Sequence, residues 1–335
     1  MVQYIRFLRT PQSDVGKKAI DISAVVAVTT DLGDAFFSED VELLADVVEA
    51  NSPHGVLYSQ TIKWQASTRA LKFAVHCPGK YLSRPVRLHV TTKETETASQ
   101  ALEIPKILDV WSCVFLLSDK QRTDPIVERR IALSNRSVVR MWEETGDSIA
   151  RHIWDASLGF LVYFAHALST SPIDGMSLLV SLFKSSKLVK CDLLLTDLED
   201  AQEILASNIR CAAPVAGSTV RSEVLDWASS LDDSSNANYD LILVSDCIYN
   251  PDSSLHLVET LRQLATRTPE TVILVGFKRR HTEDDLFFAR MRTANFDILE
   301  TLKIPLPYID TDQDVDRPTA EFFTYKMGTR PQNDS

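Results

Sequence analysis

Hydrophobic and polar positions alternate with two different rhythms along the chain. Up to about residue 115, short apolar runs alternate partly with polar residues at a spacing of two, which is typical of half-buried β-strands. Proline, glycine and polar stretches separate these runs, and the segment from Asp40 to Ala50 is predicted to be a helix. Strands are predicted at residues 55–58, 71–76 and 86–90. We therefore expect a β-rich accessory domain over residues 1–120.

From about residue 130 the pattern predicts strands that alternate with helices. The expected strands are 191–197, 220–227, 241–245 and 271–277; the expected helices are 158–168, 200–209 and 253–265; and segments 296–304 and 321–327 are expected to pair antiparallel at one edge. This alternation predicts an α/β domain with a mostly parallel sheet that helices cover on both faces. We place it at residues 121–328, followed by a polar tail at 329–335.

Composition narrows the choice of partner and compartment. The chain has 335 residues, of which 44% are hydrophobic and 24% charged, and a formal net charge of −11. That charge argues against nucleic acid as a partner and suits a basic protein surface. No apolar run has the length of about 18–20 residues that crosses a bilayer. The five scattered cysteines lack CxxC spacing, so we expect neither a disulfide framework nor a metal site. We expect a monomer in the cytoplasm, with the nucleus as a further compartment.

The segment Tyr239–Asn250 combines a buried strand with a chemically active end. Residues 241–245 form a largely apolar run, which is typical of a parallel strand buried on both faces. Asp246 and Tyr249 follow at its carboxyl end, where open α/β sheets bind their ligands. The carboxylate would hold a cationic group, and the tyrosine ring would wall a slot for an alkyl-ammonium chain. The alternative for Asp246 is to cap the helix that begins near Asp252.

Other strand ends carry candidates with two interpretations each. Asp197 would accept hydrogen bonds from the ribose hydroxyls of an adenosine cofactor, or would cap the helix that begins near Glu199. Trp227 would lie flat on a purine, or would be ordinary core. Trp154 would be a core anchor or a lid over a ligand, whereas His152 has no partner in view and suits a structural role.

Taken in order, four segments resemble the seven-strand, S-adenosylmethionine-dependent protein-lysine methyltransferases called methyltransferase family 16. They are Ile153-Trp154-Asp155-Ala156, Leu195-Thr196-Asp197-Leu198-Glu199, Leu225-Asp226-Trp227 and Leu243-Val244-Ser245-Asp246-Cys247-Ile248-Tyr249. The resemblance covers roughly residues 125–328. It implies a Rossmann-like seven-strand methyltransferase sheet, S-adenosylmethionine as cofactor and a protein substrate that presents a lysine.

The resemblance also implies a role for each candidate residue. Trp154 would border the cofactor, Asp197 would bind its ribose and Trp227 would contact the adenine. Asp246 and Tyr249 would match the D-x-x-Y element beside the methyl group and the target lysine, so both are predicted to be catalytic, and Asp246 also to contact the cofactor.

One element of the family pattern is missing. Members carry a strand followed by a loop of the type E-x-G-x-G-x-x-G before the strand that ends in Asp197. Here the interval from Ser169 to Ser177 contains only Gly175, which would match the last glycine and bind the cofactor. Either the chain is a degenerate relative that no longer binds the cofactor, or its sequence lacks a short block at a splice junction.

The sequence thus supports two functions from different classes. The first is methyl transfer from S-adenosylmethionine to a lysine amine of a protein. The second is a catalytically impaired, methyltransferase-like scaffold that binds other proteins. Methylation of a small amine is a weaker third possibility.

Overall fold

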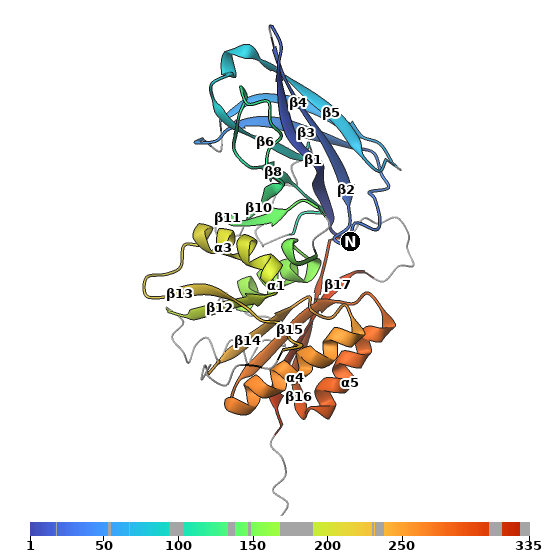
Figure 1. Cartoon of the computed structure of the whole chain (residues 1–335). Helices are drawn as coiled ribbons and strands as arrows, with labels where there is room; N and C mark the ends of the chain where they lie inside the picture. Colours follow the sequence, from blue (N-terminus) through green and yellow to red (C-terminus); the bar gives the residue numbers. More distant parts are fainter. Residues whose placement is uncertain are drawn as a thin grey trace, which may run out of the picture. The chain divides into compact units, whose positions relative to one another are not determined.

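The computed structural model describes most of the chain as two compact units (Figure 1). The described residues are 1–17, 19–52, 55–66, 68–93, 104–132, 138–146, 149–167, 190–229, 231, 238–307 and 317–328. We call residues 1–153, 203–213 and 307–311 the N-terminal unit. The C-terminal unit contains residues 154–202, 214–306 and 312–335.

The N-terminal unit is a β-sandwich. One sheet has the strand order β5-β2-β1-β7, and the other has the order β11-β10-β8-β6-β3-β4, with β9 paired to β6. The bounds are β1 Gln3–Val15, β2 Ala19–Thr29, β3 Val41–Glu49, β4 Val56–Trp64, β5 Leu71–Pro78, β6 Pro85–Thr92, β7 Ile107–Leu108, β8 Val110–Ser112, β9 Phe115–Leu116, β10 Ile126–Ala132 and β11 Val138–Glu144. Val26 of β2 and Leu88 of β6 belong to one buried cluster, so both sheets contribute to the core.

The helix predicted from Asp40 to Ala50 is wrong, because this segment is strand β3. Leu43, Ala45 and Val47 are buried at a spacing of two, and β3 pairs antiparallel with both β4 and β6. Two ladders of backbone hydrogen bonds and a period-2 apolar face therefore outweigh the local helix propensity of this acidic, alanine-containing segment. The strands predicted at 55–58, 71–76 and 86–90 are confirmed as β4, β5 and β6.

The N-terminal unit extends beyond residue 120, the boundary predicted from the sequence. β10 pairs antiparallel with β8, and β11 pairs with β10. Most of helix α3, Gln202–Cys211, also belongs to this unit. The Asn208 side chain accepts a hydrogen bond from the Trp142 backbone N–H at 2.7 Å and donates one to its carbonyl at 2.9 Å. These two bonds attach α3 to the edge strand β11.

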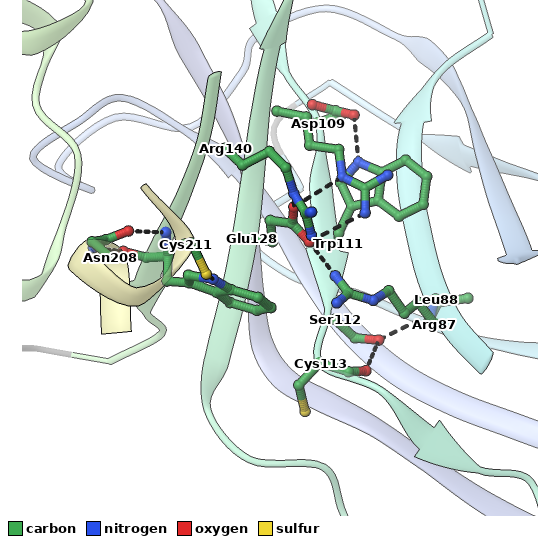
Figure 2. A network of polar contacts seen from close by, with 12 residues as sticks. Arg87, Leu88, Asp109, Trp111, Ser112, Cys113, Glu128, Arg140, Asn208 and Cys211 are labelled. Carbon is green, nitrogen blue, oxygen red and sulfur yellow. Dashed lines mark hydrogen bonds and ion pairs between the residues drawn. The ribbon is translucent and has the colours of Figure 1, made fainter. Parts of the chain in front are cut away.

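A buried carboxylate organises the outer face of the second sheet (Figure 2). The fully buried side chain of Glu128 contacts three guanidinium groups, those of Arg87, Arg130 and Arg140. Burial alone would raise the pKa of Glu128, but hydrogen bonds from Arg140 and Arg130 and the charge of Arg87 lower it to about 2. Glu128 is therefore ionised at neutral pH and joins β6, β10 and β11 through its arginines.

This depressed pKa predicts an acid-dependent loss of stability. The contribution of Glu128 is complete above its ordinary pKa of about 4.5 and disappears as the pH falls towards 2, a loss of about 3 kcal/mol. Urea unfolding of the native chain and of Glu128→Gln should therefore show a stability difference that shrinks between pH 5 and pH 2. A difference that stays constant over this range would contradict the prediction.

In its described residues, the C-terminal unit contains a parallel strand pair, a four-stranded sheet and the α-helices α1, α4 and α5. β12 pairs parallel with β13, while the second sheet has the order β14-β15-β17-β16, with β14 and β15 parallel and the other pairs antiparallel. The bounds are α1 Asp155–Ala167, β12 Asp192–Asp197, β13 Thr219–Val224, β14 Leu241–Ser245, α4 Pro251–Arg267, β15 Val272–Lys278, α5 Asp285–Thr293, β16 Phe296–Pro305 and β17 Thr319–Met327, with Gln202 as the first residue of α3. The predicted antiparallel edge pair is confirmed as β16 and β17.

Strand β15 is buried along its whole length because both of its faces are covered. Ile273, Val275 and Phe277 share a core cluster with residues of α4 and α5. On the other face, a Cβ at Gly276 would lie 2.5 Å from a ring carbon of Phe160 on α1. Glycine is therefore required for α1 to approach the sheet this closely. The predicted α/β class with an additional β-rich region is confirmed.

The described strands of the C-terminal unit do not form one continuous sheet. Among the described residues, β12 pairs only with β13, and β14 pairs only with β15. Gly175 and the surrounding interval, where the family's first strand and glycine-rich loop are expected, lie outside the described residues. No helix in the described part of the chain is long and apolar enough to cross a membrane.

Candidate functional site

Asp246 lies immediately after β14 in an unusual backbone conformation. Its φ of 54° is in the left-handed region, which aspartate tolerates better than most residues. Its backbone N–H donates a hydrogen bond to the carbonyl of Gly276 on β15 at 2.8 Å, so the neighbouring strand holds the turn in place. The carboxylate points inward, and 1% of the side chain is exposed.

The carboxylate of Asp246 is bound by a cation from the same chain. The two terminal nitrogens of Arg280 donate to its two oxygens, each at 2.7 Å, and the backbone N–H of Lys278 donates to one of them at 3.3 Å. A fork of this kind is the strongest common pairing of arginine with a carboxylate. Arg280 therefore occupies both oxygens of Asp246, and the contact of this carboxylate with a cationic substrate group stays a prediction.

Trp154 joins the same cluster. The Arg280 guanidinium carbon lies 5.6 Å from the centre of the Trp154 ring, which is within the range of a cation–π contact. Next to Trp154, the buried carboxylate of Asp155 pairs with Lys278 Nζ at 2.7 Å. Two cations from the end of β15 thus connect the start of α1 with the end of β14. The sequence prediction missed both cations, although a run of basic residues directly follows the buried strand.

Asp197 ends strand β12, and one hydrogen bond to its carboxylate is found within the described ranges. One oxygen accepts a hydrogen bond from the backbone N–H of Leu198 at 2.8 Å. The short helix that follows, η3 Glu199–Ala201, has Leu198 at its N-cap and receives no side-chain cap. The geometry therefore does not favour helix capping as the role of Asp197. Burial and the nearby Asp200 raise the pKa of Asp197, as expected for a carboxylate with few donors around it.

The ends of β12 and β14 lie within electrostatic reach of one another. Burial, followed by the negative charges of Asp246 and Asp197, raises the pKa of the Cys247 thiol to about 12. The pKa of Tyr249 is raised by burial, by Cys247 and by Asp197. Both predicted carboxylates therefore raise the pKa of the same thiol.

Tyr249 and Trp227 present aromatic surface beside this segment. The Tyr249 side chain is half exposed, whereas Trp227 is partly buried and packs against the cluster that contains Val244 and Ile248. One part of the Trp227 side chain thus packs in the core, and another part is accessible to solvent.

Asn250 caps helix α4, because its side chain accepts a hydrogen bond from the Asp252 N–H. Capping is therefore not the role of Asp246.

An open hollow of about 510 Å³ lies beside the ion pair. It is lined by Arg279, Arg280, His281, Thr282 and Asp285. It includes neither Asp197 nor Trp227, so its walls are distinct from the predicted adenosine site.

His152 belongs to the N-terminal unit, where its ring nitrogen Nε2 lies 2.9 Å from the carbonyl of Gly146.

The α/β fold and the acidic and aromatic residues at its strand ends are typical of methyltransferases. The comparisons with known proteins agree with this class. Residues 133–294 match the family described as lysine methyltransferase. The family predicted from the sequence is therefore confirmed.

Two of the named relatives are protein-lysine methyltransferases, and a third matches most of the chain. The chain is 23% identical over 305 residues to the UPF0665 family protein C23C4.06c of Schizosaccharomyces pombe, covering 86% of this chain and 92% of that protein. It is 30% identical over 106 residues to the protein N-lysine methyltransferase METTL21A of Danio rerio, covering 31% of this chain and 48% of that protein. It is 38% identical over 63 residues to the protein-lysine N-methyltransferase EFM6 of Saccharomyces cerevisiae, covering 19% and 25%. The chain thus spans about half of the zebrafish relative.

A search of solved structures gives a weak likeness to a methyltransferase. It is a SAM-dependent methyltransferase of Methanosarcina mazei, with a TM-score of 0.31 and 8% identity, covering 42% of this chain and 83% of that chain. This likeness is too small to add to the argument.

Proposed function

We propose that the chain transfers a methyl group from S-adenosylmethionine to the side-chain amine of a lysine in a protein substrate. The observation that carries the proposal is the convergence of Asp197, Asp246 and Tyr249 on the segment around Cys247. The family match and the names of METTL21A and EFM6 support the reaction class. The scaffold alternative is not favoured, because these relatives are named as enzymes.

The described residues fit an adenosyl group at two points. Asp197 has carboxylate oxygens available for ribose hydroxyls, since Leu198 provides its one hydrogen bond from the described residues. Trp227 keeps accessible ring surface beside the core, which suits contact with a purine. When bound, S-adenosylmethionine would supply the electrophilic methyl group. Gly175, the proposed contact with the methionine part, lies outside the described residues.

The chain's own side chains would position the lysine amine. An amine must be neutral to attack, and a partly dry, aromatic-lined slot lowers its pKa. The pKa of Tyr249 is raised, so its phenol is protonated at neutral pH and provides a ring wall and a hydrogen-bonding hydroxyl. Asp246 would act by fixing Arg280 and the backbone at the end of β14, because Arg280 already binds both of its oxygens.

Methyl transfer can be tested together with the role of the tyrosine. The full chain, S-adenosylmethionine labelled in its methyl group and a mixture of lysine-containing polypeptides should yield labelled methyl-lysine after acid hydrolysis. We expect Tyr249→Ala to reduce labelling at least tenfold, and Tyr249→Phe to retain most of it if the ring rather than the hydroxyl lines the slot. The absence of labelled lysine with the native chain would overturn the proposal.

The proposal includes a monomer in the cytoplasm. All five cysteines are free, which is typical of a reducing compartment. Light scattering and fluorescence microscopy of a tagged chain would test these two statements.

A further inference from the structure

The N-terminal unit contains a groove that the methyltransferase proposal does not use. The groove has a volume of about 530 Å³ and lies between strand β11, the segment 150–153 and helix α3. Its volume is within the range typical of ligand pockets, about 300–1,000 Å³. The aliphatic part of its wall includes Met141, Ile153, Ile204 and Leu205. The groove therefore offers apolar surface for side chains of a partner.

A guanidinium group stands at the edge of this groove. Arg140 lines it, and 49% of its side chain is exposed. Its Nε donates to Glu128, and no other partner for the guanidinium is found among the described residues. The two terminal nitrogens of Arg140 therefore remain available to an acceptor from outside, in the planar arrangement that fits a carboxylate.

The described residues that line the groove include two arginines, Arg140 and Arg151, and no aspartate or glutamate. Arg151 pairs with Glu144 outside the lining. On the adjoining sheet face, Arg130 and Arg87 share Glu128 with Arg140, so three guanidinium groups surround one carboxylate (Figure 2). The cationic lining contrasts with the net charge of −11 for the whole chain. Charge complementarity therefore favours an anionic occupant.

His152, a residue that lines the groove, has a buried acceptor with no partner in the described part of the chain. His152 lines the groove, and with Nε2 donating to the carbonyl of Gly146, its Nδ1 is an acceptor. This Nδ1 is buried and makes no hydrogen bond with any described residue. Burial and the charge of Arg6 lower the pKa of His152, which keeps the ring neutral. An unpaired buried acceptor is costly, which makes this part of the groove wall polar.

The groove wall is held in a defined shape. Asn208 of α3 makes the two hydrogen bonds with the Trp142 backbone, and the Trp142 indole N–H donates to the Cys211 sulfur at 2.9 Å. Figure 2 shows Asn208 and Cys211 on the helix beside the strand that carries Arg140. Such a wall loses little conformational entropy when a ligand binds.

We infer that this groove binds a peptide segment of a partner protein in which acidic and apolar residues alternate. A carboxylate pairs with Arg140, and apolar side chains occupy the aliphatic wall. This binding does not depend on methyl transfer.

Fluorescence anisotropy of the full chain with a labelled peptide of alternating glutamate and leucine tests the inference. We expect saturable binding that weakens with added salt, and no binding of the same peptide with glutamine in place of glutamate. Arg140→Gln should weaken binding about tenfold or more, the loss expected for a charge-assisted hydrogen bond. Ala212→Trp, which fills the groove without changing charge, should have a similar effect.

The matched control is Arg262→Gln, since Arg262 is a similarly exposed arginine that pairs with Glu259 on α4. It should bind the peptide as the native chain does, and circular dichroism should show that every variant is folded. Equal binding by the native chain and Arg140→Gln would overturn the inference, as would an equal loss in Arg262→Gln. Tighter binding of a single-stranded RNA oligonucleotide than of the peptide, at the same salt concentration, would assign the groove to a different class of ligand and overturn it as well.

Discussion

Replacing Asp246 with alanine should lower the free energy of unfolding of the C-terminal unit by about 3–5 kcal/mol, the cost of leaving one partner of a buried ion pair without its counter-charge. The reason is that the Arg280 side chain is 7% exposed and would keep its charge without the two 2.7 Å bonds to the carboxylate. The same variant should lose methyl transfer, because the end of β14 and the Arg280–Trp154 contact lose their support. Urea unfolding followed by far-UV circular dichroism measures the first effect.

Two further variants distinguish an unpaired charge from a general loss of packing. Adding Arg280→Met to Asp246→Ala removes the guanidinium that has lost its carboxylate partner. This double variant should recover part of the lost stability. Arg262→Ala breaks an exposed pair with Glu259 and should cost at most about 1 kcal/mol. If Asp246→Ala changed the stability no more than Arg262→Ala does, the buried pair would not contribute as its geometry implies.

Asp197→Ala should abolish measurable binding of S-adenosylmethionine. Ribose hydroxyls that donate to a carboxylate form charge-assisted hydrogen bonds worth about 1.5–3 kcal/mol each, so losing two of them reduces affinity by about a hundredfold or more. The pKa of Asp197 is raised by burial, yet the residue accepts only the Leu198 N–H from the described part of the chain. Isothermal titration calorimetry with S-adenosylmethionine and with its demethylated product measures the affinity.

The neighbouring acid provides the control for this experiment. Asp200→Ala removes a similar charge three residues away and should leave cofactor affinity within about threefold, since long-range charge effects near the surface are screened. Equal affinities for the native chain and Asp197→Ala would exclude the ribose role. Failure of the native chain to bind either ligand would show that the missing glycine-rich pattern has cost the chain its cofactor.

Strands with long apolar runs were predicted correctly from the sequence. The segment that was wrongly predicted to be a helix has partners that are distant in the sequence. The apolar run 241–245 and the run 271–277 appear as the parallel pair β14 and β15, because buried parallel strands need apolar residues on both faces. The segment 40–50 was predicted to be a helix, but its residues 41–49 form β3, which pairs with β4 and β6. Its partners lie distant in the sequence, and a local pattern does not contain them.

In the candidate site too, residues at strand ends were predicted from the local pattern, whereas a pairing with a distant partner was not. Asp197, Asp246 and Tyr249 were predicted from their positions at strand ends, since the chemistry of α/β sheets gathers there. Arg280 was not predicted, because its partner Asp246 lies 34 residues away and the pairing depends on how β15 ends beside β14. The roles of Asp197, Asp246, Tyr249, Trp154 and Trp227 in binding and catalysis stay predictions.

Local order along the chain sufficed for the α/β class, the β-rich accessory region and the family, because these depend on periodicity and on short motifs in a fixed sequence. The long-range folding of the chain decided which charges meet. It buried Asp246 against Arg280, surrounded Glu128 with three arginines and left Arg140 and His152 facing a groove. Ion pairs and grooves form between segments far apart in the sequence, and their energies depend on burial and distance, which are properties of the packed molecule alone.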